Sequence, residues 1–478
     1  MINLKYIKNQ KFSEAKLVEI LFYTFPLWFI VGNLAVSINT LLFIVASLFL
    51  IQKKQLTFRF NNSSWFLLAF FLYFFVSTTI QFQRPGLLYE TIQNWSLENN
   101  PIFKSFLLIR FPILIFVVDT LFFNKILNLK KLFFSSLLCT SFVCFDIVLQ
   151  YITGFDLFGY KRQGSWNMGP FGDEWIAGSY LKNFSFFSFF YIFVTLKNKK
   201  ISNLILVTIV ALHMVAILLS GNKMPMILFL FGCVLIFFLI KDLRFALSLG
   251  LLFFLSAFFL LVNYDNYENK NYYKASYKAF INDINIKKFI KVNKKDDSIK
   301  KDTDEKKLNE YQGGFPEEII LLKHSGYNRI FYTAIKMWKD QPLVGFGFKS
   351  FRIKCWDMLE KDNEERKITK KPQFIVCANH PHNYYLELLS EAGIIGTSLM
   401  IIFFLILLKS SYDHLKKYYH QKDVEMNLLI PVIILFFLEI WPLKSTGSFF
   451  TTWGATFFWL NIGLLLSTQW LFKTKNAN

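Results

Sequence analysis

The chain has 478 residues, of which 54% are hydrophobic and 19% aromatic, including 59 phenylalanines. This is more apolar surface than one soluble domain needs for its core, so the composition argues against an ordinary soluble protein and favours a membrane protein. The 53 lysine and arginine residues exceed the 33 acidic residues and give a net charge of +20, but they fall in short clusters between apolar runs, which is typical of membrane-topology signals and not of a nucleic-acid-binding surface. We therefore expect the lipid bilayer, and no nucleic acid, as a partner.

Twelve apolar segments are long enough to cross the bilayer as helices, which takes roughly 20 residues each. The basic N-terminus leads into the first segment without a small-residue cleavage pattern, so we expect this segment to remain as an anchor. Very tight turns are predicted at Gly32-Asn33 and at Ser220-Gly221. The predicted spans lie near residues 17–33, 34–51, 64–82, 105–123, 131–152, 176–196, 201–219, 223–241, 245–263, 393–409, 427–442 and 452–472.

The basic clusters predict how the chain is oriented. When the spans alternate from a cytoplasmic N-terminus, every cluster lies on the cytoplasmic side, as the positive-inside rule requires. Both termini are then cytoplasmic, and the long segment 264–392 lies outside, which is the periplasm for a protein of a bacterial inner membrane. We predict an all-α integral membrane protein with about 12 transmembrane helices: a bundle over 1–263, a large periplasmic loop over 264–392, and a second bundle over 393–478.

The large loop has two parts. Residues 264–312 are rich in lysine, asparagine, aspartate and tyrosine, which indicates a weakly ordered stretch. Residues 316–392 are expected to be folded and to carry the catalytic part, with Pro316 in a first helical turn. A second predicted helix includes Asn328–Lys339 and ends at Gln341-Pro342, before a tight loop at Gly345-Phe346-Gly347. The apolar face of this helix consists of Ile330, Ala334 and Met337.

Two of the five cysteines, Cys355 and Cys377, lie in the large loop. A disulfide between them in an oxidising periplasm would close about 22 residues and contribute roughly 3 kcal/mol in the chain-entropy model. It would hold the segment that leads to His380. The alternative is a pair of free thiols. The remaining cysteines, Cys139, Cys144 and Cys233, are in apolar runs and are expected to pack as small hydrophobic residues.

Two histidines, His380 and His382, stand just outside the membrane, where a helix begins that runs into the tenth span. An imidazole with a pKa near 6.5 can accept a proton from a hydroxyl group at neutral pH. The membrane boundary is also where the head group of a lipid-linked substrate would lie. The alternative is that His382 and Asn383 only cap the helix, and these residues alone favour neither interpretation.

The sequence from His382-Asn383 to Gly393-x-x-Gly396 resembles the signature of the O-antigen ligase and O-antigen polymerase superfamily. The similarity extends to Arg329 and the segment 340–347, to residues 154–167 with Arg162, and to the turn 220–223 with Lys223. The resemblance implies a membrane glycosyltransferase-like fold. It also implies an inverting enzyme that works without a metal or other cofactor.

The resemblance also implies roles for individual residues. His382 would be the general base or would orient the acceptor, with His380 as its neighbour or substitute. Arg329, Lys223, Arg162 and Asn383 would bind the substrate, the three cations acting as a clamp for the diphosphate. Lys223 departs from the arginine that is common in the family, so it keeps the charge and loses the bidentate fork.

Each cation also has an ordinary interpretation. Arg329 can be a solvated charge on an amphipathic helix. Lys223 can be a lysine at a helix end that extends to the membrane surface. Arg162 stands beside Lys161, which could be the phosphate contact in its place.

By resemblance, the donor is a glycan on undecaprenyl diphosphate, and the acceptor is lipid A-core or a second lipid-linked glycan. Ligase, polymerase and a protein-glycosylating relative differ only in the acceptor and are not separable here. Two rivals are a nonenzymatic assembly partner, whose loop docks other proteins, and a transporter of lipid-linked glycans. A transporter needs a polar path, and the charged candidates inside the spans are Arg110, Asp119, Asp146, Lys182 and Glu439.

Overall fold

The computed structural model describes residues 14–58, 62–83, 100–196, 198–283, 327–369, 375–421 and 425–471. Within these residues every regular element is a helix, and the bridging contacts are isolated pairs outside any strand. The prediction of an all-α protein is therefore confirmed for the described part of the chain. The helix start expected at Pro316 lies outside it.

The helices follow the predicted spans along the chain, because runs of apolar residues fold as helices where no water is available to bond the backbone. Their bounds are α1 (Glu14–Tyr23), α2 (Phe25–Val31), α3 (Asn33–Lys53), α4 (Asn62–Gln83), α6 (Pro101–Phe106), α7 (Arg110–Phe123), α8 (Leu129–Thr153), α9 (Ala177–Thr195), α10 (Lys199–Leu219), α11 (Lys223–Leu239), α12 (Arg244–Tyr264), α13 (Tyr272–Asp283), α16 (Asn328–Asp340), α17 (Phe351–Thr369), α18 (Tyr384–Gln421), α19 (Ile430–Glu439) and α20 (Thr452–Leu471).

In the described residues, seven helical segments are long and apolar enough to cross a membrane. The shorter helices α11 and α19 are also apolar. A multi-pass membrane protein is therefore supported, and twelve as the number of spans stays a prediction. The seven segments are Asn33–Lys53, Ser63–Gln83, Pro101–Phe123, Leu129–Thr153, Lys200–Leu219, Lys241–Tyr264 and Tyr384–Lys417.

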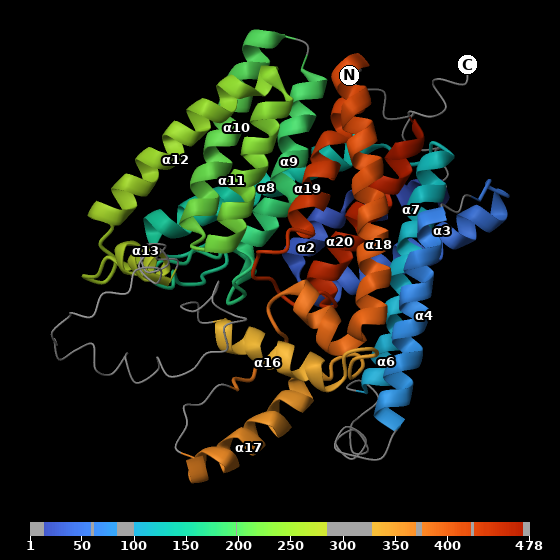
Figure 1. Ribbon diagram of the computed structural model, residues 1–478. Coiled ribbons are helices and arrows are strands. Elements are labelled where there is room, and N and C mark those ends of the chain that lie inside the picture. The colour runs from blue at the N-terminus through green and yellow to red at the C-terminus, as the bar shows by residue number, and fades with distance from the viewer. Residues whose placement is uncertain are drawn as a thin grey trace.

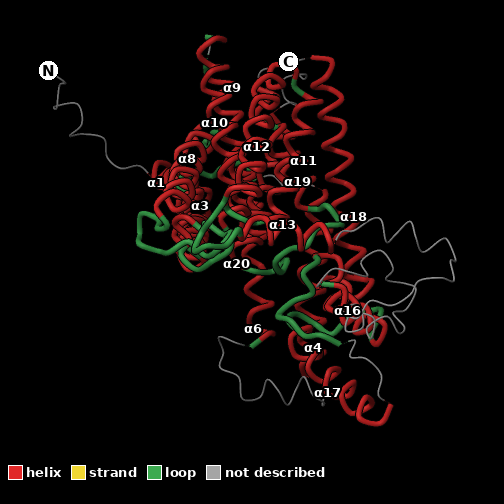
Figure 2. Tube along the Cα trace, turned by 90° about the vertical axis from the view of Figure 1, so that its left-hand side faces the viewer, coloured by secondary structure: helices red, strands yellow, loops and turns green. Residues whose placement is uncertain are grey.

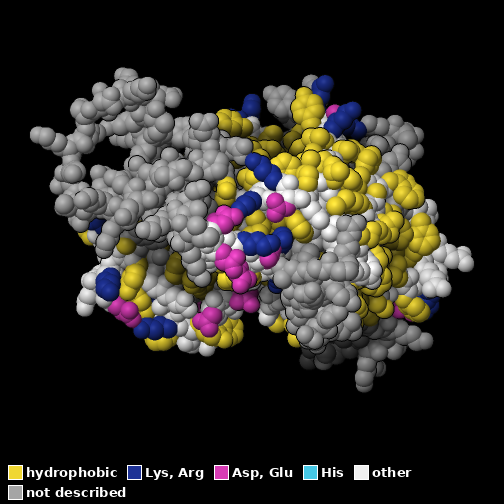
Figure 3. All heavy atoms as spheres, turned by 60° about the horizontal axis from the view of Figure 1, so that its bottom comes forward, with side chains coloured by type: hydrophobic (Ala, Val, Ile, Leu, Met, Phe, Trp, Pro, Cys, Tyr) yellow, Lys and Arg dark blue, Asp and Glu magenta, His cyan; other side chains and the backbone are white. Residues whose placement is uncertain are grey.

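The helices form one bundle, and the more polar helices lie towards one end of it. Figure 1 shows α13 at the lower ends of α11 and α12, and α16 and α17 near the lower end of α18. Figure 2, turned by 90°, also places α16 and α17 at the bottom of the molecule. Figure 3 brings this end forward and shows acidic and basic side chains gathered near the middle of the face, with hydrophobic side chains at its flank.

Large apolar side chains on the outside of the bundle support a lipid environment. Leu34, Leu72, Leu204 and Phe238 are between 66% and 75% exposed, and each lies on an apolar helix. A soluble protein rarely leaves a broad apolar surface uncovered. Acyl chains would cover these residues.

The first predicted span, 17–33, is divided into two helices. Thr24 stands between α1 and α2, where its hydroxyl donates to the Ile20 carbonyl at 2.8 Å, and Pro26 occupies the first turn of α2. Proline lacks the N–H that would continue the helical ladder, which explains the break. Gly32, with φ +122°, and Gly221, with φ +72°, form the two tight turns that were predicted.

The structure differs from the prediction of a weakly ordered stretch over 264–312. Tyr272–Asp283 forms helix α13, in which Tyr273 and Tyr277 are buried four residues apart on one face. The Tyr273 hydroxyl donates to the Leu219 carbonyl at 2.8 Å. Two buried tyrosines thus order a segment whose composition alone indicates weak order. Residues 284–312 lie outside the described part.

The predicted helix at 328–339 is confirmed as α16, and its predicted apolar face is buried. Ile330, Ala334 and Met337 pack in a small core with residues of α17 and with Ile375. Cys355 of α17 and Cys377 form the expected disulfide, which closes a separation of 22 residues. These contacts attach the segment that begins at residue 375 to α16 and α17. The same segment leads to the two histidines.

Candidate active site

Helix α18 is interrupted at Gly393, and the gap is filled by the loop that follows α16. Gly393 has φ +65° and ψ −172°, so the helical ladder is broken there. The carbonyls of Ser390 and Glu391 accept from Phe346 (3.1 Å) and Gly347 (2.8 Å), and Ile394 donates to the Pro342 carbonyl at 2.8 Å. The predicted loop at 345–347 and the glycine of the 393–396 motif therefore belong to one joint, which fixes α18 relative to α16.

We expect Gly393→Ala to destabilise this joint by about 2 kcal/mol or more, because an alanine at positive φ is strained and lacks space here. A Cβ on Gly393 would lie 2.4 Å from the Leu343 carbonyl oxygen. Thermal unfolding in detergent measures the effect. Gly447→Ala is the matched control, since a Cβ on Gly447 meets no atom within 4 Å. Equal stability of the two variants would contradict the prediction.

His382 is held by a loop more than 60 residues later in the chain. Its Nδ1 lies 3.2 Å from the Thr446 carbonyl oxygen, and its own carbonyl accepts from the Thr446 N–H at 2.8 Å. His382 has φ +57°, a left-handed conformation that is uncommon for residues other than glycine and recurs at functional sites. The rings of His380 and Tyr327 lie 4.2 Å and 4.8 Å from the His382 ring, between centroids.

This contact selects the tautomer of His382. A carbonyl oxygen can only accept, so Nδ1 carries the proton in the neutral imidazole and Nε2 is the nitrogen that can accept one. Burial lowers the pKa of His382. Burial, with the charges of His382 and Arg352, lowers the pKa of His380 to about 4. Both rings are therefore neutral at neutral pH, as a general base requires.

We expect the acid limb of the pH profile of kcat/KM to lie below pH 6.5, the ordinary value for histidine. Protonation removes the base, and a lowered pKa moves that loss to lower pH. The rate should therefore stay on its plateau as the pH falls through 6.5 and decrease only beyond it. Initial rates in proteoliposomes between about pH 4.5 and 8 test this. An acid limb above 6.5 would contradict it.

Asn383 caps α18, as the alternative interpretation of the motif predicts. Its Oδ1 accepts from the Tyr385 N–H at 3.0 Å, and its Nδ2 donates to the Pro442 carbonyl at 2.8 Å. The side chain of His382 makes a different contact, to Thr446, so capping accounts for Asn383 and not for the imidazole. The structure gives Asn383 a positioning role, and contact with substrate stays a prediction.

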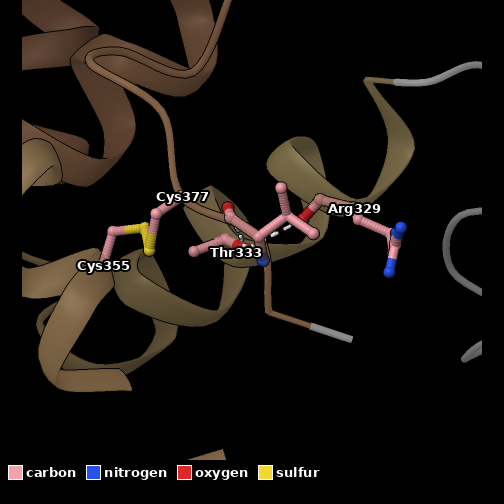
Figure 4. Close-up of a disulfide and its surroundings, with 5 residues drawn as sticks. Arg329, Thr333, Cys355 and Cys377 are labelled. Carbon is pink, nitrogen blue, oxygen red and sulfur yellow. Dashed lines mark hydrogen bonds between the residues drawn. A yellow bond between two sulfur atoms is a disulfide. The ribbon is translucent and has the colours of Figure 1, made fainter. Parts of the chain in front are cut away.

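Arg329 lies in the first turn of α16, two residues after Tyr327, whose ring faces His382. Its side chain is partly exposed and points away from the disulfide, as Figure 4 shows. One turn later, the Thr333 hydroxyl donates to the Arg329 carbonyl at 2.8 Å and accepts from the Val376 N–H at 3.2 Å. The structure thus places the start of α16 beside the two histidines.

Lys223 and Arg162 share a second group of residues, around α13. The Lys223 Nζ donates to the Ser276 carbonyl of α13 at 2.9 Å. Arg162 is buried and its Nη2 donates to both carboxylate oxygens of Asp265 at 2.9 Å. The guanidinium of Arg162 also lies 4.5–5.6 Å from the rings of Tyr151, Tyr267 and Tyr273. Arg162 therefore joins α8, α13 and the segment between α8 and α9, and a role with diphosphate would require it to leave Asp265.

Three residues near the histidines were not predicted: Tyr327, Arg352 and Thr446. Tyr327 stands two positions before Arg329, and an aromatic residue so close to a candidate cation could have been noticed. Arg352 acts through its charge on the pKa of His380. Thr446 belongs to a short connection between two apolar helices, and no local pattern indicates that its carbonyl contacts His382.

Among the described residues, no group of three or more histidine, cysteine, aspartate or glutamate side chains is arranged to hold a metal ion.

Comparison with known families gives one finding for this chain. Residues 204–401 match the family model described as O-antigen ligase. The matched region contains His380, His382, Asn383, Arg329 and Lys223, and it confirms the predicted superfamily. Arg162 lies outside it. No curated protein matches the chain.

Proposed function

We propose, because residues 204–401 match the O-antigen ligase family model, that this chain is a glycosyltransferase that moves a glycan from undecaprenyl diphosphate to a hydroxyl group of lipid A-core. The observation that supports a catalytic role most directly is the contact between His382 Nδ1 and the Thr446 carbonyl. It leaves Nε2 as the proton acceptor of a neutral, partly buried ring. The ring lies between the start of α18 and the start of α16, beside the apolar bundle.

In the proposed reaction, His382 Nε2 takes the proton of the acceptor hydroxyl. The hydroxyl oxygen then attacks the anomeric carbon on the face opposite the diphosphate, so a new C–O bond forms and the configuration inverts. The bond to the diphosphate breaks, and its electron pair leaves with the undecaprenyl diphosphate. Fixed cations stabilise the charge that develops on the leaving group. We assign this role to Arg329, with Lys223 and Arg162 as further contacts.

The proposed orientation puts the histidines, α13, α16 and α17 on the periplasmic side of the inner membrane and both termini in the cytoplasm. The distribution of basic clusters supports it. The divisions at 1–263, 264–392 and 393–478 belong to the same proposal. A transporter is less well supported, since Lys182 and Glu439, two of the charges that could line a polar path, are paired with each other inside the protein.

The test is complementation of O-antigen display in a strain that lacks its own copy of the gene. Wild type and His382→Ala are compared at matched membrane levels, and lipopolysaccharide is examined on a gel. Ligation predicts that the variant shows bare core and accumulates full-length glycan on undecaprenyl diphosphate. Core with a single repeat unit would instead identify a polymerase that joins lipid-linked units. A wild-type pattern would refute the catalytic role of His382.

A further inference from the structure

Three charged side chains form a buried group next to the loop that contacts His382. Glu439, at the end of α19, binds Lys182 of α9 through Oε1 and Lys444 through Oε2, the latter at 2.8 Å. The side chains of all three are at most 7% exposed. Replacing a buried ion pair by well-packed apolar residues is often neutral or even stabilising, so stability alone does not account for this triad.

Lys444 belongs to the loop that connects α19 to α20, residues 440–451, and this loop also holds the histidine motif. The carbonyls of Pro442 and Lys444 accept from Asn383 Nδ2 at 2.8 and 3.3 Å. Thr446, two residues after Lys444, makes the paired contacts with His382. The Lys444 Nζ also lies 4.6 Å from the centre of the Tyr384 ring, at the first residue of α18.

The loop is anchored at both ends, with the His382 contact between the anchors. At the C-terminal end of the loop, Ser448 Oγ (2.5 Å) and the Phe449 N–H (2.6 Å) donate to the carboxylate of Glu387 in α18. At the N-terminal end of the loop, the structure describes all of residues 441–447, and Lys444 is the one residue of these that is buried. The neighbouring Leu443 is 79% exposed. Trp441 packs against Phe231 and Phe437 where the loop leaves α19. Beyond it, the ion pair of Lys444 with Glu439 holds this stretch together with the hydrogen bonds to Asn383 and His382.

We propose that the Lys182–Glu439–Lys444 triad positions His382 for catalysis. It fixes the 440–451 loop so that the Thr446 carbonyl keeps Nδ1 of His382 protonated and leaves Nε2 as the base. Lys444 is the residue through which the triad acts, and Glu439 and Lys182 hold it in place. Partners of this kind, one contact removed from the reacting group, set ring orientation and tautomer. The proposal rests on the proposed function, because it takes His382 as the base.

The test is the transfer rate of Lys444→Met in proteoliposomes that contain a lipid-linked glycan donor and a lipid A-core acceptor. We expect kcat to fall about 10- to 100-fold with KM changed less than about 3-fold, since the base is misplaced and the substrate groups are retained. The Thr446 carbonyl raises the pKa of His382, so its loss should also move the acid limb of the pH profile to lower pH. A merely structural loss of active protein would not move that limb.

Two further variants decide the outcome. Lys444→Met leaves Glu439 beside Lys182 and can lower the amount of folded protein. The triple variant Lys182→Met, Glu439→Gln, Lys444→Met removes all three charges, so that no buried charge is left without a partner. The triple variant should fold and show the same loss of kcat and the same movement of the acid limb to lower pH. Glu19→Gln breaks the exposed pair of Glu19 with Lys131 and should match wild type.

The results separate the two proposals. If His382→Ala is inactive while the triple variant has the wild-type kcat and acid limb, the positioning role is overturned and the proposed function stands. If His382→Ala keeps the wild-type rate, the proposed function fails, and the positioning role fails with it.

Discussion

Replacing His382 by alanine is expected to lower kcat of glycosyl transfer by about 10²- to 10⁴-fold, the range that a positioned general base contributes. Of the two imidazoles near Thr446, His382 is the one whose carbonyl and Nδ1 both meet that residue. Its Nε2 is therefore the better-defined base. Single-turnover rates with purified protein at saturating donor measure the chemical step, and KM should change little, because the base acts mainly in the transition state.

His380→Ala is the matched control for this prediction. The Nε2 of His380 is buried and makes no hydrogen bond with the residues that the structure describes, and the pKa of His380 is lowered to about 4, so this ring is a weak base. We expect its removal to cost about tenfold, through the loss of the ring that lies 4.2 Å from His382. A larger loss in His380→Ala than in His382→Ala would exchange the roles of the two residues.

The order of the helices could be predicted from the sequence because each span is a long apolar run, and such a run has one stable structure in a bilayer. The two differences have separate causes, one local and one tertiary. Pro26 breaks the first span, and the hydrophobicity of a window of residues does not reveal a break of this kind. Helix α13 forms where the composition is polar, because Tyr273 and Tyr277 become buried against other helices, and burial depends on neighbours that a local window does not contain.

The site could be predicted only as far as local motifs reach. The histidines and Arg329 were found because they stand in recognisable patterns along the chain. Their partners are distant: Thr446 lies 64 residues from His382, and Asp265 lies 103 residues from Arg162. The sequence identifies Lys182 and Glu439 as charges within predicted spans, but their joint contact with Lys444 depends on how α9 and α19 pack. No spacing rule gives that arrangement.

Removal of the disulfide is expected to loosen the segment that carries His380. In the double variant Cys355→Ser, Cys377→Ser, the closed loop of 22 residues opens, and the chain-entropy model gives a loss of about 3 kcal/mol. Opening of α17 and of the residues after 375 should then be about 100-fold more frequent. Hydrogen exchange of peptides from these segments measures it directly, and the transfer rate should fall as His380 and His382 lose their support.

The consequence should be local, because the two cysteines join α17 to the segment after residue 375 and do not cross-link the apolar bundle. Peptides from α8 and α10 are therefore expected to exchange as in wild type. Wild type treated with a reductant should reproduce the variant, whereas Cys139→Ser, which removes an unpaired thiol in α8, should not. Unchanged exchange in α17 would show that the contacts of Thr333 with Val376 and the buried face of α16 hold the segment without the disulfide.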